Sequence, residues 1–206
     1  MRTRPNNWLL AKIDPGSGLA LDIGGGAGRL GSEIRNRGYA YINADPLATG
    51  DGAVRAVGEH LPFKDSSFTL LVSEDSLEHV SDPAGTLREA RRVLDPNGLL
   101  VIWVPFMHPF HGDDLWRFSP LGLEKVLGDS GFTIASLEAP LGAASVVAQI
   151  VAEVFRRIGL RSAEHPLESL GAWIDRTLSK TMGAGKAFAE AFLVVAFPVA
   201  ADSDLT

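Results

Sequence analysis

From Leu19 onward, short apolar runs alternate with longer amphipathic segments along the chain. This alternation is typical of βαβ units that build a mostly parallel sheet. Each apolar run is followed by Gly, Asp, Pro or Ser, the residues that commonly end strands. The pattern predicts strands over residues 19–23, 40–44, 54–57, 69–73, 99–104, 132–137 and 191–197.

Amphipathic segments between these runs predict helices. Leu87, Ala90 and Val93 recur at helical spacing, and Ser119 before Pro120 is a typical helix start. The run Asp95–Gly98, with sequence DPNG, predicts a turn. The helices are expected over residues 29–37, 83–94, 119–127, 144–158 and 167–181.

The stretch 139–189 interrupts the alternation with two helices in succession before the last strand. We therefore expect one α/β domain over 1–206, with a core over 19–138 and 191–198 and a helical insertion over about 142–189. The apolar first helix of the insertion fits core packing, a lid over a pocket, a homodimer contact or contact with a lipid tail.

Four glycines lie within five residues in the run LDIGGGAG, directly after the first predicted strand. Glycine lets the backbone turn with positive φ and approach a ligand, and a following helix N-terminus favours polar or anionic groups. Gly24, Gly26 and Gly28 fit G-x-G-x-G, with Asp22 two residues earlier, whereas Gly26, Gly28 and Gly31 fit G-x-G-x-x-G. The loop predicts a nucleotide site, and both kinds of nucleotide cofactor remain open on the loop alone.

Asp45 ends the second predicted strand, beside the glycine loop at the carboxyl edge of the sheet. A carboxylate at this place can accept hydrogen bonds from both hydroxyls of a ribose. As an alternative, Asp45 caps a turn that begins with Asp-Pro.

The composition excludes some classes of protein and site but does not indicate a function. The chain has 206 residues, 46% of them hydrophobic, and a formal net charge of −6, which argues against a nucleic-acid scaffold. It has no cysteine, which excludes disulfides, thiolate zinc sites and cysteine nucleophiles. We expect a cytoplasmic protein with no signal peptide and no membrane span, because no apolar run reaches the length either needs.

These residues together resemble a known family. The run LDIGGGAG, then NADP, then LPF-x-D-x-S-F, LEHV-x-D-P and R-R-V-L-x-P-x-G resembles the class I S-adenosylmethionine-dependent methyltransferases, in particular methyltransferase type 11. The similarity extends from about Leu19 to Leu137. It implies a three-layer, Rossmann-like, seven-stranded sheet with helices on both faces and a final antiparallel hairpin.

The resemblance also implies the cofactor, S-adenosylmethionine, and its site. The glycine loop would face the methionine part, Asp45 and Pro46 the ribose, and the LPF block the adenine. Relatives often have an acid where this chain has Val57, so Glu59 or a main-chain oxygen would substitute. Leu77, Glu78 and His79 are expected to open the next helix, with packing favoured over catalysis. The cofactor residues are therefore expected to be Asp22, Gly24, Gly25, Gly26, Gly28, Asp45, Pro46, Glu59, His60, Leu61 and Ser73.

Methyl transfer needs an aligned acceptor and, for some acceptors, a base. The loop FMHPFHGDDLWRFSP follows a strand at the edge where open α/β sheets bind ligands. Histidine can take a proton and arginine can hold an acidic group. The catalytic candidates are His108, His111, Asp113 and Arg117.

Alternatives accompany these candidates. His108, His111, Asp113 and Asp114 could ligate a metal, but the prediction is no metal, and Arg117 could pair with a neighbouring aspartate. The loop also resembles a subset of the family that occurs with glycan and natural-product pathways. We predict an enzyme that methylates an oxygen, nitrogen or carbon of a small molecule. The rivals are an NAD-dependent oxidoreductase and a cofactor-binding protein without turnover.

Overall fold

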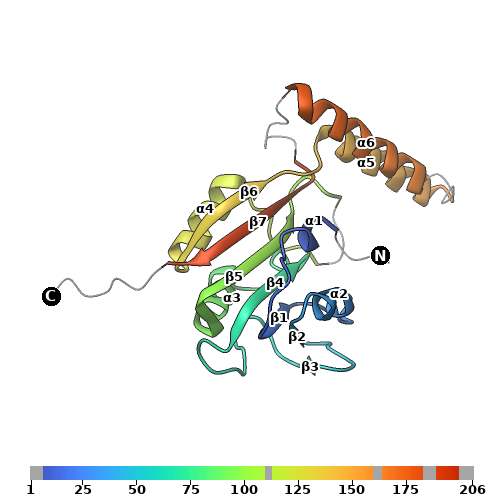
Figure 1. Ribbon diagram of the computed structural model, residues 1–206. Coiled ribbons are helices and arrows are strands. Elements are labelled where there is room, and N and C mark those ends of the chain that lie inside the picture. The colour runs from blue at the N-terminus through green and yellow to red at the C-terminus, as the bar shows by residue number, and fades with distance from the viewer. Residues whose placement is uncertain (1–6, 110–112, 160–163, 183–188, 200–206) are drawn as a thin grey trace.

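The computed structural model describes residues 7–109, 113–159, 164–182 and 189–199, which form one sheet flanked by helices (Figure 1). Its strands are β1 (Leu19–Ile23), β2 (Ala40–Ala44), β3 (Ala53–Val54), β4 (Phe68–Glu74), β5 (Leu94–Pro105), β6 (Phe132–Glu138) and β7 (Ala191–Pro198). Its helices are α1 (Asn7–Leu10), α2 (Gly31–Asn36), α3 (Pro83–Val93), α4 (Pro120–Asp129), α5 (Ala143–Arg157) and α6 (Glu164–Met182).

The sheet has seven strands in the order β3-β2-β1-β4-β5-β7-β6. β7 runs antiparallel to both β5 and β6, and the other pairs are parallel. Because Ile23 pairs with Ala44, the glycine loop after β1 and Asp45 after β2 leave the sheet at the same edge. The expected Rossmann-like fold with a final antiparallel hairpin is confirmed.

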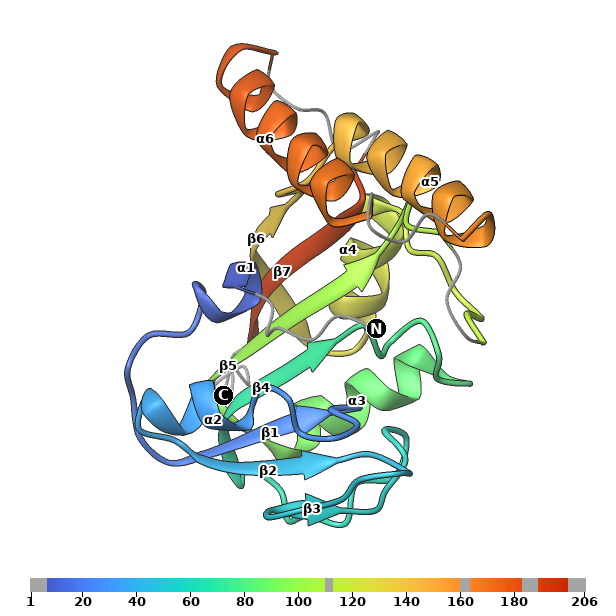
Figure 2. The same ribbon diagram turned by 90° about the vertical axis from the view of Figure 1, so that its right-hand side faces the viewer.

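Strand residues alternate between two buried layers. On one face Leu21 and Leu71 pack with α3 and α4, and on the other Leu70 and Val101 pack with α1 and α2. Figure 2 shows the two helical layers on opposite sides of the sheet. Burial on both faces explains why the strands read as continuous apolar runs.

Several boundaries differ from the prediction. The turn expected over Asp95–Gly98 lies inside β5, which begins at Leu94. Phe68 pairs with Leu94 and Leu70 already pairs with Leu99, so these residues form a bulge in the ladder. The short helix α1 was not predicted, and α2 begins at Gly31, two residues later than expected.

The expectation that Leu77, Glu78 and His79 open a helix is wrong. They lie in a turn, and α3 begins at Pro83, where Asp82 accepts a hydrogen bond from the backbone N–H of Gly85. A proline at the first helical position after an aspartate cap is a strong start signal, and it places the start four residues beyond His79.

The helical pair before the last strand is confirmed as α5 and α6, which lie beyond the carboxyl ends of β4 and β5 (Figure 1). Asp175 of α6 accepts hydrogen bonds from the backbone N–H groups of Gly142, Ala144 and Ser145, at 2.8, 3.1 and 2.9 Å. α6 thereby caps the start of α5. None of the helices in the described ranges is long and apolar enough to cross a membrane.

Candidate active site

Two adjoining cavities open at the carboxyl edge of the sheet. The larger, of about 640 Å³, lies between the glycine loop and the α5–α6 pair. The smaller, of about 370 Å³, lies between the end of β2 and the turn before α3. Gly24, Asp75 and His79 line both cavities, so the two form one continuous cleft at the edge where open α/β sheets bind ligands.

The glycine loop is packed against its neighbours in a way that requires glycine. Gly24 has φ +75°, and a Cβ there would overlap the hydroxyl of Ser76. A Cβ at Gly25 would overlap the carboxyl group of Asp22. Gly24, Gly25 and Gly26 line the larger cavity, whereas Gly28, also predicted to bind the cofactor, lines neither.

Asp22 lies beneath this loop and is 1% exposed. Its Oδ2 accepts a hydrogen bond from the hydroxyl of Tyr41 at 2.6 Å. Burial raises the pKa of Asp22 to about 7, although the Tyr41 hydrogen bond acts in the opposite direction. Asp22 lines the larger cavity, and its Oδ1 has no hydrogen-bond partner among the described residues.

Asp45 links the loop to the smaller cavity. Its Oδ2 accepts from the backbone N–H of Gly26 at 3.0 Å, and its Oδ1 from that of Leu47 at 2.7 Å. A carboxylate has about four acceptor positions, so both oxygens can still accept from a ligand hydroxyl. Asp45 and Pro46 both line the smaller cavity.

Of the residues predicted to contact the adenine, Glu59, His60 and Leu61, only one lies at the cleft. Val57 and Glu59 line the smaller cavity, but His60 and Leu61 do not. Glu59 accepts from the backbone N–H groups of Ser81 and Asp82, so it fixes the turn before α3. The residues of this cavity that the sequence did not single out are Ala56, Gly58, Ser76, Val80 and Ser81.

The end of β4 contributes the residues after Ser73. Ser73 is buried and lines neither cavity, whereas Glu74 and Asp75 line the larger one. Glu74 pairs with Arg29, whose guanidinium lies on the same wall. Asp75 has φ +48°, a conformation uncommon outside glycine and frequent at ligand sites.

Only some residues of the predicted acceptor loop lie at the cleft. His108 lines the larger cavity, with its Nδ1 3.3 Å from Oε1 of Glu190, a carboxylate that is 1% exposed. Asp113 is exposed and lines neither cavity. Arg117 pairs with Asp114 at 2.6 Å and donates to the backbone oxygen of His108, so it holds the loop. His111 lies outside the described residues.

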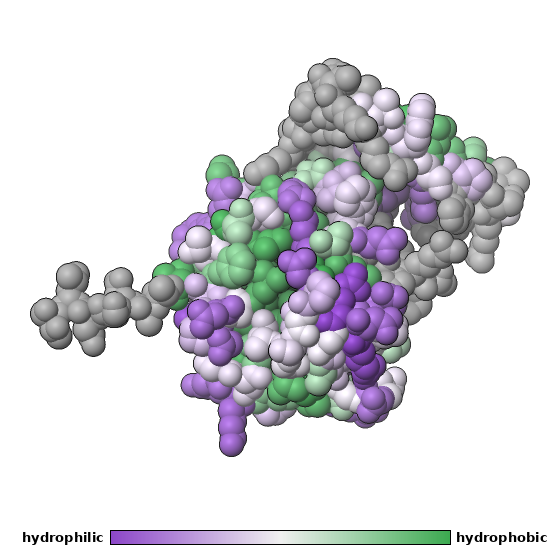
Figure 3. Space-filling model, in the orientation of Figure 1, coloured by the Kyte–Doolittle hydropathy of each residue, from purple (hydrophilic) through white to green (hydrophobic). Residues whose placement is uncertain are grey.

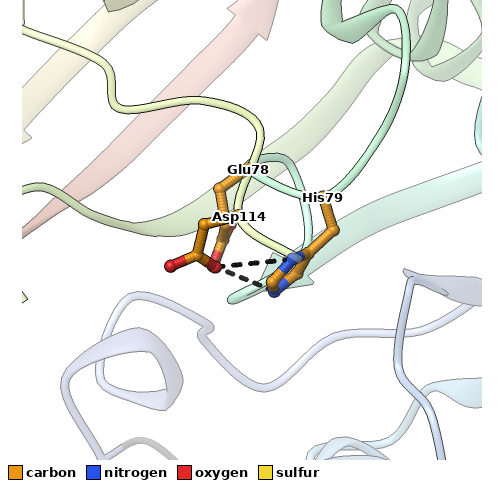
Figure 4. A group of neighbouring side chains, drawn as sticks. All are labelled: Glu78, His79 and Asp114. Carbon is orange, nitrogen blue, oxygen red and sulfur yellow. Dashed lines mark ion pairs between the residues drawn. The ribbon is translucent and has the colours of Figure 1, made fainter. Parts of the chain in front are cut away.

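Figure 4 shows a second group, formed by Glu78, His79 and Asp114. His79 lies 3.5 Å from Asp114 and 3.7 Å from Glu78, measured between ring nitrogen and carboxyl oxygen. Glu78 is fully buried, and this burial raises its pKa to about 8. The ligand types suit a metal, but Arg117 already neutralises Asp114, and a divalent cation would face its guanidinium. We therefore assign no metal to this group.

Backbone hydrogen bonds join the same two segments. The N–H groups of Leu115 and Trp116 both donate to the oxygen of Glu78, and the indole of Trp116 donates to the oxygen of Val80. These bonds fix the acceptor loop against the wall of the smaller cavity. Sequence reasoning missed this group and Glu190, because their partners come from segments far apart along the chain.

One protein-family model matches part of the chain. Residues 21–102 match the model of the methyltransferase domain family. This segment is similar to the methyltransferase domain family. This match includes the glycine loop, Asp45 and the strands β1 to β4 that carry them.

Relatives agree with this assignment. An uncharacterized methyltransferase of Mycobacterium sp. (strain JLS) is 34% identical over 133 residues, which are 59% of this chain and 50% of that protein. One of Mycobacterium tuberculosis (strain H37Rv) is 33% identical over 135 residues, 59% of this chain and 51% of that protein. The chain therefore spans about half the length of the curated relatives it matches.

A solved structure shows a similar fold over nearly the whole chain. The S-adenosylmethionine-dependent methyltransferase of Mesorhizobium loti superposes with a TM-score of 0.59 and 18% identity, over 92% of this chain and 95% of that one. At this identity the likeness shows the fold, and activity has to be argued from the site.

The cleft residues fit S-adenosylmethionine. The buried Oδ1 of Asp22 is an acceptor at the loop, where an ammonium group can donate. Arg29 offers a cation on the same wall for a carboxylate, and Asp45 offers acceptor positions for ribose hydroxyls. The rival oxidoreductase would need a hydride-transfer partner such as a tyrosine, but the two tyrosines of the chain, Tyr39 and Tyr41, lie outside the two cavities.

Proposed function

We propose that this domain transfers a methyl group from S-adenosylmethionine to a small-molecule acceptor. The observation that supports it is the continuous cleft, in which the smaller cavity contains Asp45 and the larger contains the glycine loop and a histidine–carboxylate pair. Such a cleft can hold a nucleoside in one part and an acceptor in the other.

We assign the proposed cofactor contacts from the residues that line the two cavities. Asp45 and Pro46 hold the ribose, while Ala56, Val57 and Val80 give apolar contact to the adenine. The glycine loop, Asp22 and Arg29 hold the methionine end. Gly28, His60, Leu61 and Ser73 lie outside both cavities.

His108 is the proposed proton acceptor. When bound, the sulfonium cofactor supplies an activated methyl group, so the protein has to position the acceptor and remove its proton. His108 lines only the larger cavity, and its Nδ1 lies 3.3 Å from the buried carboxylate of Glu190. Arg117 positions His108 through its backbone oxygen, and the roles of His111 and Asp113 stay predictions.

The test is binding first and turnover second. We expect S-adenosylhomocysteine to bind with micromolar affinity in calorimetry. A panel of alcohols, amines, phenols and carbon acids, offered with radiolabelled S-adenosylmethionine, should then yield a labelled product from at least one class. Loss of the methyl group to water alone, with tight cofactor binding, would favour a binding protein without turnover.

The exposed face of the helical pair supports a proposed homodimer. Val147, Ile150, Val154 and Ile158 recur at helical spacing and are exposed, as is Trp173 of α6. In Figure 3, hydrophobic residues lie on the upper right, over this pair. Sedimentation should show a dimer, and Val154→Glu should convert it to a monomer.

The remaining assignments stay predictions of the sequence. These are the division into a core and an insertion, a cytoplasmic location, the absence of nucleic acid as a partner, and an acceptor from glycan or natural-product metabolism. The last rests on the resemblance of the acceptor loop alone, and the acceptor panel tests it.

A further inference from the structure

We propose that the methyl acceptor is an amine that enters the larger cavity as a cation. This inference rests on the proposed function and narrows its substrate class. Three carboxylates converge on the side of the cavity away from the glycine loop: Glu153 of α5, Glu168 of α6, and Glu190 directly before β7. They belong to separate segments, so the fold and not one local run brings them to the same wall.

The charge of the cavity wall is one-sided. Its described carboxylates are Asp22, Glu74, Asp75, Glu153, Glu168 and Glu190. Two guanidinium groups compensate part of this charge: Arg29 pairs with Glu74 at the cofactor end, and Arg157, outside the lining, pairs with Glu153 at 2.8 Å, which leaves Asp75, Glu168 and Glu190 for the acceptor part. A cleft that is lined by one sign of charge concentrates ligands of the opposite sign. The bound cofactor has a net charge of +1, because it carries a sulfonium, an ammonium and a carboxylate. The cavity wall therefore keeps an excess of negative charge that an acceptor cation can neutralise.

Glu190 gives this wall a buried charge. It is 1% exposed, and its Oε1 lies 3.3 Å from Nδ1 of His108. Taking a carboxylate out of water is unfavourable, and a nearby positive charge offsets this cost. An ammonium group in the cavity would supply such a charge beside the imidazole that has to take its proton.

Gln149 is an independent sign of a donor ligand. Its Oε1 is buried and has no hydrogen-bond partner among the described residues, and its side chain lines the same cavity from α5. Buried acceptors without a donor are uncommon and need an explanation. An amine N–H is a donor that satisfies this oxygen, whereas a carboxylate or phosphate ligand has none to offer.

The chemistry balances with the groups already described. The ammonium nitrogen gives one proton to His108 and recovers its lone pair. It then forms a bond to the methyl carbon as the carbon–sulfur bond breaks and the electron pair goes to sulfur. The products are an N-methylated ammonium, which carries the positive charge that the sulfonium loses, and the neutral thioether S-adenosylhomocysteine, and the proton on His108 leaves to solvent. The carboxylate of Glu190 lies 3.3 Å from Nδ1 of His108, beside the imidazole that takes part in this step.

The test compares head groups on matched tails. Phenethylamine, phenethyl alcohol and phenylpropionate, with hexylamine, hexanol and hexanoate, are titrated into the protein saturated with S-adenosylhomocysteine. We expect each amine to bind at least about tenfold more tightly than its matched acid, because the wall attracts cations. Raising salt from about 50 to about 500 mM should weaken the amines and leave the alcohols unchanged.

Variants of the cavity wall show which carboxylates cause the preference for amines. Glu168→Gln and Glu190→Gln should each weaken amine binding about 3- to 10-fold and leave the alcohols unchanged. Glu124→Gln, an exposed glutamate of α4 outside both cavities, is the matched control and should change neither. Glu168 is exposed on its helix, so this variant is expected to fold even where Glu190→Gln does not.

Equal binding of the three head groups, including no binding by any, or preference for the acids would overturn the amine assignment. Binding of S-adenosylhomocysteine in the same samples keeps the proposed function separate, because that affinity does not depend on the acceptor. Failure of the cofactor to bind would instead contradict the proposed function.

Discussion

The two walls of the cleft are built in different ways. The glycine-loop wall consists of residues that directly follow β1, β2 and β4, so the order of the strands alone brings Gly24, Asp45 and Asp75 together. The acceptor wall brings together His108, Glu190 and the helical pair from segments up to about eighty residues apart. A cofactor site that follows from topology can therefore keep its form while the acceptor site changes.

The largest expected difference between the walls is in turnover. Replacement of His108 by glutamine should lower the rate about 100-fold or more, the range for loss of a general base. The affinity for S-adenosylhomocysteine should stay within about twofold, because His108 lines the acceptor wall only. Rates and calorimetry on the same preparations measure both.

His60→Gln is the control, since His60 is exposed and outside both cavities. His79→Gln provides a contrast, because His79 lines both cavities and should lower both quantities. Equal losses of turnover and affinity in His108→Gln would remove it from the acceptor wall.

On the cofactor wall, Gly24→Ala should reduce the free energy of unfolding by about 2–5 kcal/mol. The reasons are positive φ, at about 1–2 kcal/mol, and overlap with Ser76, at about 1–3 kcal/mol. Gly50→Ala is the control, because Gly50 also has positive φ but nothing lies within 4 Å of its added Cβ. Urea unfolding measures both, and equal losses would mean that the packing of the loop contributes nothing.

The buried carboxyl of Asp22 should make stability depend on pH. Its folded pKa of about 7 lies above the unfolded value of about 3.9, so the folded protein keeps a proton that the unfolded chain has lost. Stability attributable to Asp22 therefore falls as pH rises from about 4 to about 7. Between pH 5.5 and 7.5, Asp22→Asn should remove about 2 kcal/mol of this decline.

Urea unfolding at several pH values measures the slope. Asp51→Asn, a change at an exposed carboxylate, should keep the wild-type slope. Glu78, whose pKa burial raises to about 8, contributes a decline of the same sign that remains in Asp22→Asn. An unchanged slope in Asp22→Asn would show that Asp22 is ionised in the folded protein.

The smallest expected effect is that of Asp45→Asn on cofactor binding. The amide keeps the size of the carboxylate but weakens hydrogen bonds to ligand hydroxyls, so the affinity for S-adenosylhomocysteine should fall by about 1–2 kcal/mol, roughly 5- to 30-fold. Calorimetry beside Asp51→Asn tests it. A variant that binds like the wild type would limit Asp45 to its structural hydrogen bonds with the backbone N–H groups of Gly26 and Leu47.

Most of the fold was predictable because its signals are local. Apolar runs gave the seven strands, and Ser119–Pro120 gave the start of α4, where the Ser119 hydroxyl accepts from the N–H of Gly122. The error at β5 has a physical reason. Pro96 and Gly98 look like a turn in isolation, but pairing with β4 keeps the segment extended as a bulge.

The same contrast between local signals and long-range contacts applies to the candidate site. Asp22, the glycines and Asp45 sit beside strand ends, so their meeting could be foreseen. Glu190 could not, because it precedes a strand that inserts antiparallel between β5 and β6. His79 looked like the start of a helix, but it lies in a turn that is joined by hydrogen bonds to the 114–116 segment at the cleft.

The central claim is that the cleft holds a nucleoside sulfonium and not a dinucleotide. Calorimetric titration of the wild-type protein with S-adenosylhomocysteine, and in parallel with NAD, tests it most directly. The account predicts one S-adenosylhomocysteine per chain with micromolar affinity and no heat from NAD. Binding of NAD with no response to S-adenosylhomocysteine would contradict it.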